Sequence, residues 1–219
     1  MSVIAAVAFT GCATTKQTRT APPRGFLKNY DDLAPGGKGD AKLVFVREGV
    51  PWAKYDEILM DPVTLWVDGN DDLANIPPED IQLLEDYLDE AVRHALKNDY
   101  RFVDRADVTT LHLRIAITEA RGAHVVANTV SKVIPQLRIL TTAGGMATDT
   151  QLLVGRTGLE GEILDGVTQE RLVAVVDRQA GTKALRGGFG KWSDFQQACD
   201  FWAERLRARL AELRATDTP

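Results

Sequence analysis

The acidic segment that begins at Asp68 carries side-chain oxygens at the spacing of a calcium-binding loop. If Asp68 takes the first position of an EF-hand loop, the third, fifth and twelfth positions, which supply oxygen ligands, fall on Asn70, Asp72 and Glu79. Leu73 stands at the sixth position, where the sharp turn of the loop requires glycine, and two prolines directly precede the twelfth. We therefore interpret the segment as a solvated acidic loop, with calcium ligation as the alternative.

Glu160 and Glu162 form a second candidate site, because glycoside hydrolysis uses paired carboxylates. On a β-strand the two side chains would share one face, about 7 Å apart. One strand cannot place them on opposite sides of a sugar, as that reaction requires. We therefore expect two solvated glutamates, balanced by Arg171 or Arg178 across a hairpin.

His112 and Arg114 alternate with leucine and isoleucine in residues 106–119, which predicts a strand with one buried and one polar face. The polar face offers a small candidate binding site, although the same pattern is typical of half-exposed antiparallel strands. His94 is expected in a helix and His124 in a loop, and nothing in the sequence brings the three histidines together. We therefore expect neither a metal site nor a cofactor.

Cys12 follows an apolar run, residues 3–11, that is too short to cross a bilayer, since a crossing takes about 20 apolar residues. Such a run is typical of the end of a signal peptide. The ending Phe9-Thr10-Gly11-Cys12 resembles the bacterial lipobox. The resemblance implies that residues 1–11 are a signal-peptide remnant and that Cys12 is the acylated first residue of the mature chain. Ala13, in place of aspartate, implies transfer to the outer membrane. The alternative is an apolar tail followed by an ordinary thiol.

Length and composition fit one globular domain behind a linker. The chain has 219 residues, of which 44% are hydrophobic and 26% charged. A net charge of −5 argues against binding to nucleic acid, which requires a basic surface. Residues 12–24 are polar and contain two prolines, so we expect a solvated, lipidated tether there and a single domain over residues 25–215. If Cys12 is acylated, Cys199 has no partner for an intramolecular disulfide.

Hydrophobic periodicity predicts an α+β fold. Residues 41–47 and 57–67 are expected to be strands, and Pro62 requires the second to be an edge strand or to contain a bulge. Asp165-Gly166 between two apolar runs predicts a hairpin. Apolar stripes predict two long helices, the first through Ile81, Leu84, Leu88, Val92 and Leu96, the second through Phe195, Cys199, Trp202, Leu206, Leu210 and Leu213. We expect a mixed, mostly antiparallel sheet packed on one face by these helices.

Several short motifs resemble those of a bacterial lipoprotein family known only as domain of unknown function 3313. They are Gly25-Phe26-Leu27 with Tyr30 and Leu33, Asp61-Pro62-Val63, Ala116-Ile117-Thr118-Glu119, Glu160-Gly161-Glu162-Ile163-Leu164-Asp165 and Lys191-Trp192-Ser193. The resemblance extends over nearly the whole mature chain. It implies a lipoprotein and no particular activity.

The sequence contains none of the common hydrolase, metalloprotease or dinucleotide-binding signatures. We therefore expect a non-catalytic lipoprotein that is anchored in the outer membrane through acylated Cys12 and faces the periplasm. Its domain would bind an envelope protein or a glycan. The alternative is a periplasmic hydrolase or small-ligand carrier with a site built on His112, Arg114 and the hairpin glutamates.

Overall fold

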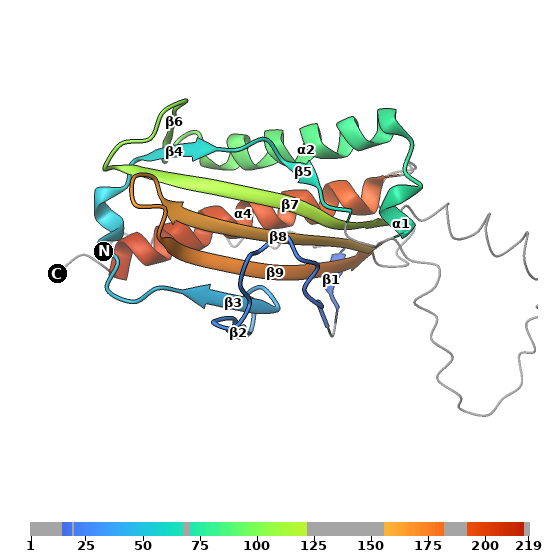
Figure 1. Ribbon diagram of the computed structural model, residues 1–219, viewed down its shortest axis with the longest axis horizontal. Coiled ribbons are helices and arrows are strands. Elements are labelled where there is room, and N and C mark those ends of the chain that lie inside the picture. Colours follow the sequence, from blue (N-terminus) through green and yellow to red (C-terminus); the bar gives the residue numbers. More distant parts are fainter. Residues whose placement is uncertain (1–14, 19, 68–70, 122–155, 182–191, 217–219) are drawn as a thin grey trace, which may run out of the picture.

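The computed structural model describes residues 15–18, 20–67, 71–121, 156–181 and 192–216, which form one mixed β-sheet with its long helices on one face (Figure 1). Nine strands in these ranges build the sheet: β1 Thr15–Gln17, β2 Ala34–Pro35, β3 Leu43–Val46, β4 Glu57–Met60, β5 Thr64–Leu65, β6 Arg101–Phe102, β7 Thr110–Arg121, β8 Arg156–Asp165 and β9 Arg171–Gly181. The helices there are the 3-10 helix η1 Trp52–Lys54 and the α-helices α1 Asp71–Ala74, α2 Pro78–Leu96 and α4 Ser193–Thr216. In this part of the chain no helix combines the length and the apolar character needed to cross a membrane.

The strand order is β2-β3-β9-β8-β7-β4-β6, with β1 also on β9 and β5 also on β7. The long central strands β7, β8 and β9 are antiparallel. Strands β4 and β5 both run parallel to β7, one after the other along the same side of it. Pro62 lies in the break between them, because proline cannot donate a hydrogen bond to the neighbouring strand. The strand predicted over residues 57–67 is therefore interrupted at Pro62, but its first part, β4, lies between β7 and β6 and is not an edge strand.

The predicted hairpin is also confirmed, and Asp165 holds its turn. One carboxylate oxygen accepts the backbone N–H groups of Val167 (3.0 Å) and Thr168 (2.9 Å). The other accepts the Tyr55 hydroxyl (2.7 Å) and the Lys54 ammonium (3.1 Å). Burial alone would raise the pKa of Asp165, but the hydrogen bonds, led by those from Thr168 and Tyr55, outweigh it and hold the pKa well below its usual range.

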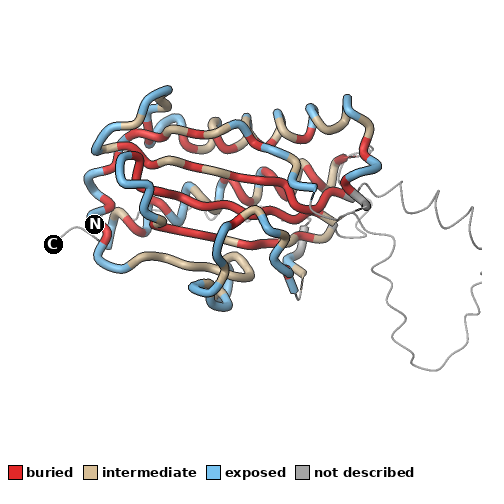
Figure 2. The backbone as a smooth tube through the Cα atoms, viewed as in Figure 1, coloured by how far each residue is buried: buried red, intermediate tan, exposed pale blue. Residues whose placement is uncertain are grey.

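Helices α2 and α4 pack side by side on one face of the sheet, which we call the helix face. Both predicted apolar stripes point into the core, where Leu84 and Leu88 of α2 and Leu210 of α4 are almost completely buried. Leu113 and Ile117 of β7 meet them from the sheet. Figure 2 shows the buried residues running along the central strands and the inner sides of the helices. The predicted α+β class and the packing of two helices on one face are confirmed.

The opposite face of the sheet, which we call the outer face, is crossed by residues 20–33, here named the N-terminal strap (Figure 1). Ala21 and Leu27 of the strap are buried against Ala174 and Val176 of β9 in a second apolar cluster. Before the strap, β1 pairs with the end of β9. The sequence interpretation of residues 12–24 as a solvated tether therefore does not hold for β1 and Ala21, which pack on the domain, whereas Thr20, Pro22 and Pro23 are exposed.

Candidate functional site

His112 and Arg114 both project from β7 onto the outer face, where the structure adds Asp61. His112 Nε2 lies 2.8 Å from Asp61 Oδ1, and His112 Nδ1 lies 3.1 Å from Gln169 Oε1. Arg114 Nε lies 3.4 Å from Asp61 Oδ2. Asp61 lies in the break between β4 and β5, which brings its carboxylate beside β7. The two residues that the sequence nominated as a binding pair therefore share one acidic partner.

Glu162 lies on the same face between two arginines. It stands opposite Arg114 in the register of β7 and β8, and Arg114 Nη1 donates to its Oε1 (2.5 Å). Arg171 donates through Nε and Nη2 to its Oε2, both at 3.0 Å. The Glu162 side chain is only 4% exposed. The predicted pairing with Arg171 is confirmed, but the predicted solvation is wrong. We call Asp61, His112, Arg114, Glu162 and Arg171 the charged cluster.

Glu160 is completely buried and has a different role. Its carboxylate accepts the backbone N–H groups of Arg24 (2.5 Å), Phe26 (3.1 Å) and Leu27 (3.3 Å) and the Tyr30 hydroxyl (2.6 Å). All four donors belong to the N-terminal strap. The prediction of a solvated Glu160 is therefore wrong, because the strap covers it.

Arg178, the other arginine predicted to balance the two glutamates, pairs with Glu119 instead, at 2.5 Å. Glu119 lies on β7 beside the described end of β8, where the register of the two strands shifts. Arg178 lies on β9 opposite Gly158 of β8. Its side chain therefore contacts Glu119 at this end of the sheet and does not pair with Glu160. The strap donors therefore stabilise Glu160 without an arginine.

The contact between Tyr30 and Glu160 changes how Tyr30 ionises. Burial, and then the hydrogen bond that its hydroxyl donates to Glu160, raise the pKa of Tyr30 to about 12. A tyrosinate beside the carboxylate would be repelled and could not donate. The strap is therefore held by a neutral tyrosine across the physiological pH range.

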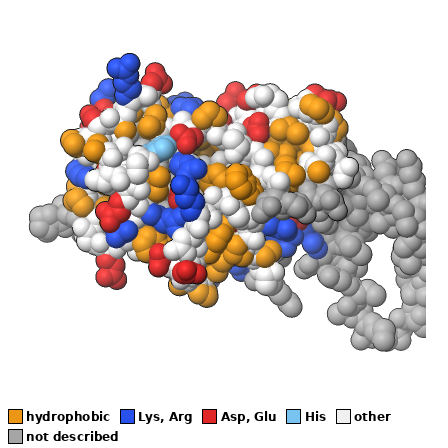
Figure 3. Space-filling model, in the orientation of Figure 1, with side chains coloured by type: hydrophobic (Ala, Val, Ile, Leu, Met, Phe, Trp, Pro, Cys, Tyr) orange, Lys and Arg blue, Asp and Glu red, His pale blue; other side chains and the backbone are white. Residues whose placement is uncertain are grey.

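An aromatic group borders the charged cluster on the outer face. The rings of Phe26 and Trp66 pack edge to face with centroids 5.6 Å apart, and the Arg114 guanidinium lies 5.4 Å from the Phe26 centroid. Trp66 is 37% exposed and Val67 48%. Figure 3 shows the outer face, with basic, acidic and hydrophobic side chains gathered beside a histidine. Aromatic and arginine side chains in this arrangement are the types that carry most binding energy at protein interfaces.

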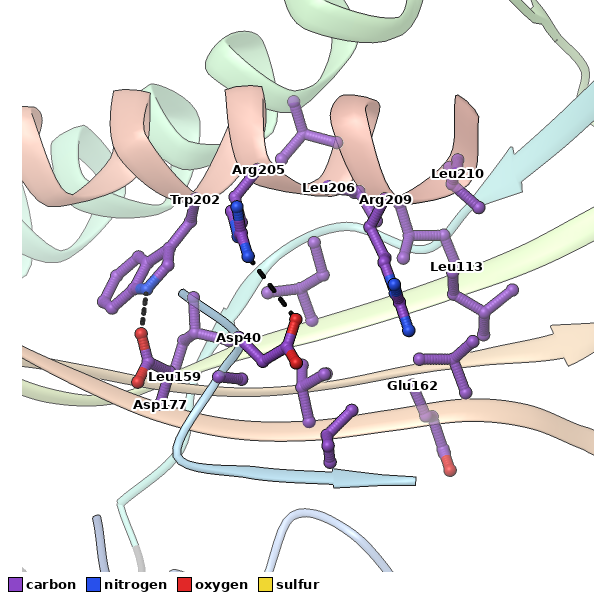
Figure 4. Close-up of a pocket in the computed structure, with 18 of the residues that line it drawn as sticks. Asp40, Leu113, Leu159, Glu162, Asp177, Trp202, Arg205, Leu206, Arg209 and Leu210 are labelled. Atoms are coloured by element: carbon purple, nitrogen blue, oxygen red, sulfur yellow. Dashed lines mark hydrogen bonds and ion pairs between the residues drawn. The ribbon is translucent and has the colours of Figure 1, made fainter. Parts of the chain in front are cut away.

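A cavity of about 130 Å³ lies on the helix face, between α4 and the strands. Aliphatic side chains make up most of its wall, and the indole of Trp202 donates to the Asp177 carboxylate at one end (2.8 Å, Figure 4). The carboxylate of Glu162 points away from this cavity. The sheet therefore separates the charged cluster from the cavity.

The other sequence candidates do not join these sites. Asp68 and Asn70 of the proposed calcium loop lie outside the described residues, whereas Asp72 lies within helix α1 and Glu79 in the first turn of α2. A helix at Asp72 is not the backbone of an EF-hand loop. Within the described ranges no group of three or more side chains of the metal-binding types could hold a metal ion.

The remaining nominated residues are scattered. His94 is exposed on α2, far from His112 in the sequence, and His124 lies outside the described residues. Cys12 and the predicted signal-peptide remnant, residues 1–11, also lie outside them. Cys199 is fully buried on α4, and burial raises the pKa of its thiol, as expected for an unreactive core cysteine.

Asp61 is the residue of the site that sequence reasoning missed. A weak signal was present, since Asp61 directly precedes the proline that separates β4 from β5. The Asp61 backbone N–H still donates to the carbonyl oxygen of Leu113 on β7 (3.0 Å), which keeps the residue beside that strand. The role of Glu160 had no local signal, because its hydrogen-bond partners lie at least 130 positions earlier in the chain.

The fold defines a single α+β domain with a charged cluster on one face of the sheet and an apolar cavity on the other. Residues 22–206 match the family described as "Protein of unknown function (DUF3313)", and the chain belongs to this family. It is 26% identical over 179 residues to "Uncharacterized lipoprotein YdcL" of Escherichia coli K12, covering 80% of this chain and 78% of that protein.

Among solved structures, the chain resembles two forms of a PelC dodecamer from Paraburkholderia phytofirmans. Their TM-scores are 0.41 and 0.40, at 14% and 13% identity. The matches cover 76% and 75% of this chain, and 97% and 96% of the PelC chains.

Proposed function

We propose that this protein is a lipoprotein anchored in the outer membrane through acylated Cys12, whose domain acts in the periplasm as a non-catalytic binding module. The observation that carries the proposal is the separation of the two candidate sites by the sheet. The charged cluster has titratable groups that are paired with one another, and the cavity has a mostly aliphatic wall whose charged side chains, such as Asp177 and Arg205, contact Trp202 and Asp40. An enzyme needs an available titratable group and an enclosed space in one place, because a general base must lie within hydrogen-bond reach of a bound substrate.

The anchoring rests on the lipobox resemblance and on the lipoprotein name of the relative. β1 begins at Thr15, so Cys12 lies three positions before the sheet, a reach of at most about 10 Å. Acylation of Cys12 would therefore hold the domain close to the lipid surface. Two or more acyl chains are needed for stable attachment.

We expect Cys12→Ser to move the protein from the outer-membrane fraction to the soluble periplasm, because the attachment site of the acyl chains is lost. Ala13→Asp should retain the acylated protein in the inner membrane, as the lipobox resemblance implies. Cell fractionation and the intact mass of the mature chain measure both effects. Cys199→Ala, which changes the buried cysteine, should leave the location unchanged. An unacylated natural protein, or a Cys12→Ser protein that stays with the membrane, would contradict the anchor.

The partner-binding surface that we propose is the aromatic group of Phe26 and Trp66 together with the neighbouring Arg114. It combines exposed aromatic area with a guanidinium and lies next to the partly exposed carboxylate of Asp61. Protein interfaces are enriched in these residue types, so we favour an envelope protein as the partner, with a glycan as the alternative.

A photo-crosslinking amino acid placed at Val67 should capture one main protein partner in intact cells, and Trp66→Ala should reduce the yield at least fivefold. Val108 is the matched control, because it is also an exposed valine but precedes the opposite end of β7. The same probe there should give no such product. Equal products from both positions, or no product from Val67, would argue against this surface.

The hydrolase alternative has one observation in its favour, the contact between His112 and Asp61, which orients the imidazole as in a general base. The same carboxylate also contacts Arg114 at 3.4 Å, which makes Asp61 part of the ion-pair network of the charged cluster. The non-catalytic function accounts for both contacts.

A further inference from the structure

The cavity between α4 and the sheet has room for a small aliphatic group. Its wall includes the side chains of Val46, Val175 and Leu206, and its volume is about 130 Å³. Gly161 of β8 also borders it, and a Cβ there would meet its nearest neighbour at 3.4 Å, so the absence of a side chain adds room. Apolar cavities of about 150 Å³ stay dry and take up benzene. By that comparison, this one holds about six carbons.

Two arginines border the cavity on one side. Arg205 and Arg209 point from α4 toward the strands (Figure 4). Arg205 Nη2 lies 3.4 Å from Asp40 Oδ1, and Arg209 Nη1 lies 2.9 Å from Glu212 Oε2. The side chains in these pairs are between 31% and 57% exposed. Exposed pairs of this kind add little stability, so the anionic group of a ligand can replace either carboxylate.

The loop before β3 packs closely against Arg205 at the border of the cavity. Gly39 has a φ of +90°, and a Cβ there would lie 3.0 Å from Arg205 Nη2. Gln17 of β1 donates through Nε2 to the backbone oxygen of Asp40 (2.8 Å), which fixes the loop to the first strand. Gln17 lies only five positions after Cys12, a reach of at most about 18 Å. An acylated Cys12 would therefore bring this border near the lipid surface.

We propose that the cavity binds the chain of a single-chain anionic amphiphile, a carboxylate or phosphate monoester with about six to eight carbons, whose head group pairs with Arg205 and Arg209. The cavity walls exclude water from the chain, and the guanidinium groups provide donors for the oxygens of the head group. Binding in solution does not depend on the lipid anchor, so failure of this proposal and failure of the proposed anchor are distinguishable.

The test measures the affinity of the full chain carrying Cys12→Ser, which has no acyl group of its own, for unbranched carboxylates of four to twelve carbons by isothermal titration calorimetry. Each added methylene should lower the Kd about fourfold up to about eight carbons, and longer chains should gain nothing further. In addition, 8-bromooctanoate should quench tryptophan fluorescence, because Trp202 borders the cavity.

Variants test the location. Val46→Phe and Gly161→Val each fill the cavity and should weaken octanoate binding at least tenfold. Leu43→Phe is the matched control for the first, because Leu43 lies on the same strand but packs in the cluster under the strap. It should leave the Kd within twofold. The protein with both arginines should bind octanoate about tenfold more tightly than 1-octanol. The double variant Arg205→Gln with Arg209→Gln should lose this preference.

Three results would overturn the proposal. The first is no saturable binding of octanoate at millimolar concentration. The second is a Kd that does not depend on chain length, or that both filling variants leave unchanged while they remain folded. The third is an affinity for 1-octanol equal to that for octanoate in the protein with both arginines, which would exclude the anionic head group.

Discussion

Replacing Glu160 with alanine is expected to lower the free energy of unfolding by on the order of 3 kcal/mol. The change removes an acceptor of three backbone N–H groups and of the Tyr30 hydroxyl, although the Leu27 N–H keeps Tyr30 Oη as a second acceptor at 3.1 Å. Each buried donor left without an acceptor costs about 1–3 kcal/mol, and water entering under a released strap recovers part of that cost. Glu160→Gln should lower the free energy of unfolding by about half as much as Glu160→Ala, because the amide keeps one acceptor oxygen. Urea denaturation at pH 7 measures both.

Glu170→Ala is the control for this prediction. It removes the same side chain from the same hairpin, but Glu170 is 54% exposed and contacts only the half-exposed Arg47 in a surface ion pair. Its effect should stay below about 0.5 kcal/mol. Hydrogen exchange at the Phe26 and Leu27 amides should accelerate in Glu160→Ala and not in the control. Equal stabilities of the two variants would mean that Glu160 does not hold the strap.

The same contact predicts a pH dependence at alkaline pH. The pKa of Tyr30 is about 12 in the folded protein, and the pKa of an unfolded tyrosine is about 10. The neutral form therefore stabilises the fold fully below pH 10, and this contribution is lost as the pH rises toward 12. Tyr30→Phe has no hydroxyl to ionise, so its stability should fall less than that of the unchanged protein as the pH rises from 10 to 12. Comparing the two proteins between pH 8 and 12 cancels the contributions of the other tyrosines.

The sequence predicts those parts of this fold that depend on local patterns. Pro62 interrupts a strand because of its own chemistry, and Asp165 forms a turn with N–H groups only two and three residues away. The apolar stripes of α2 and α4 recur at helical spacing, so their buried faces follow from the sequence alone. These features need no information about distant segments.

The outer face shows why the rest was not predictable. An alternating strand indicates which side chains share a face, but not whether another segment covers that face. The strap that buries Glu160 comes from the start of the domain, and its polar composition resembles that of a free linker. Glu162 is buried because arginines from β7 and β9 both meet it, which depends on strand order. Strand order and long-range coverage are not encoded in the spacing of single residues.

The second large effect concerns Glu162, whose replacement by glutamine is expected to lower the free energy of unfolding by about 3–5 kcal/mol. The glutamate is 4% exposed, and the Arg114 and Arg171 side chains are 28% and 16% exposed. Without its charge the two guanidinium groups face each other with no buried anion between them. Asp61 still contacts Arg114 and limits the loss on that side. Denaturant unfolding measures the change, and a loss below about 1 kcal/mol would contradict the buried triad.

A triple variant separates stability from binding in this cluster. Combining Glu162→Leu with Arg114→Met and Arg171→Met removes the whole triad and fills similar volume, so most of the lost stability should return. Asp61 and His112 keep their contact, and the backbone oxygen of Asn29 that loses its Arg171 donor is exposed to water. If Arg114 also binds the partner, the stable triple variant should still lose the crosslink from Val67. A restored fold with an undiminished crosslink would assign the triad to stability alone and confine the binding surface to Phe26 and Trp66.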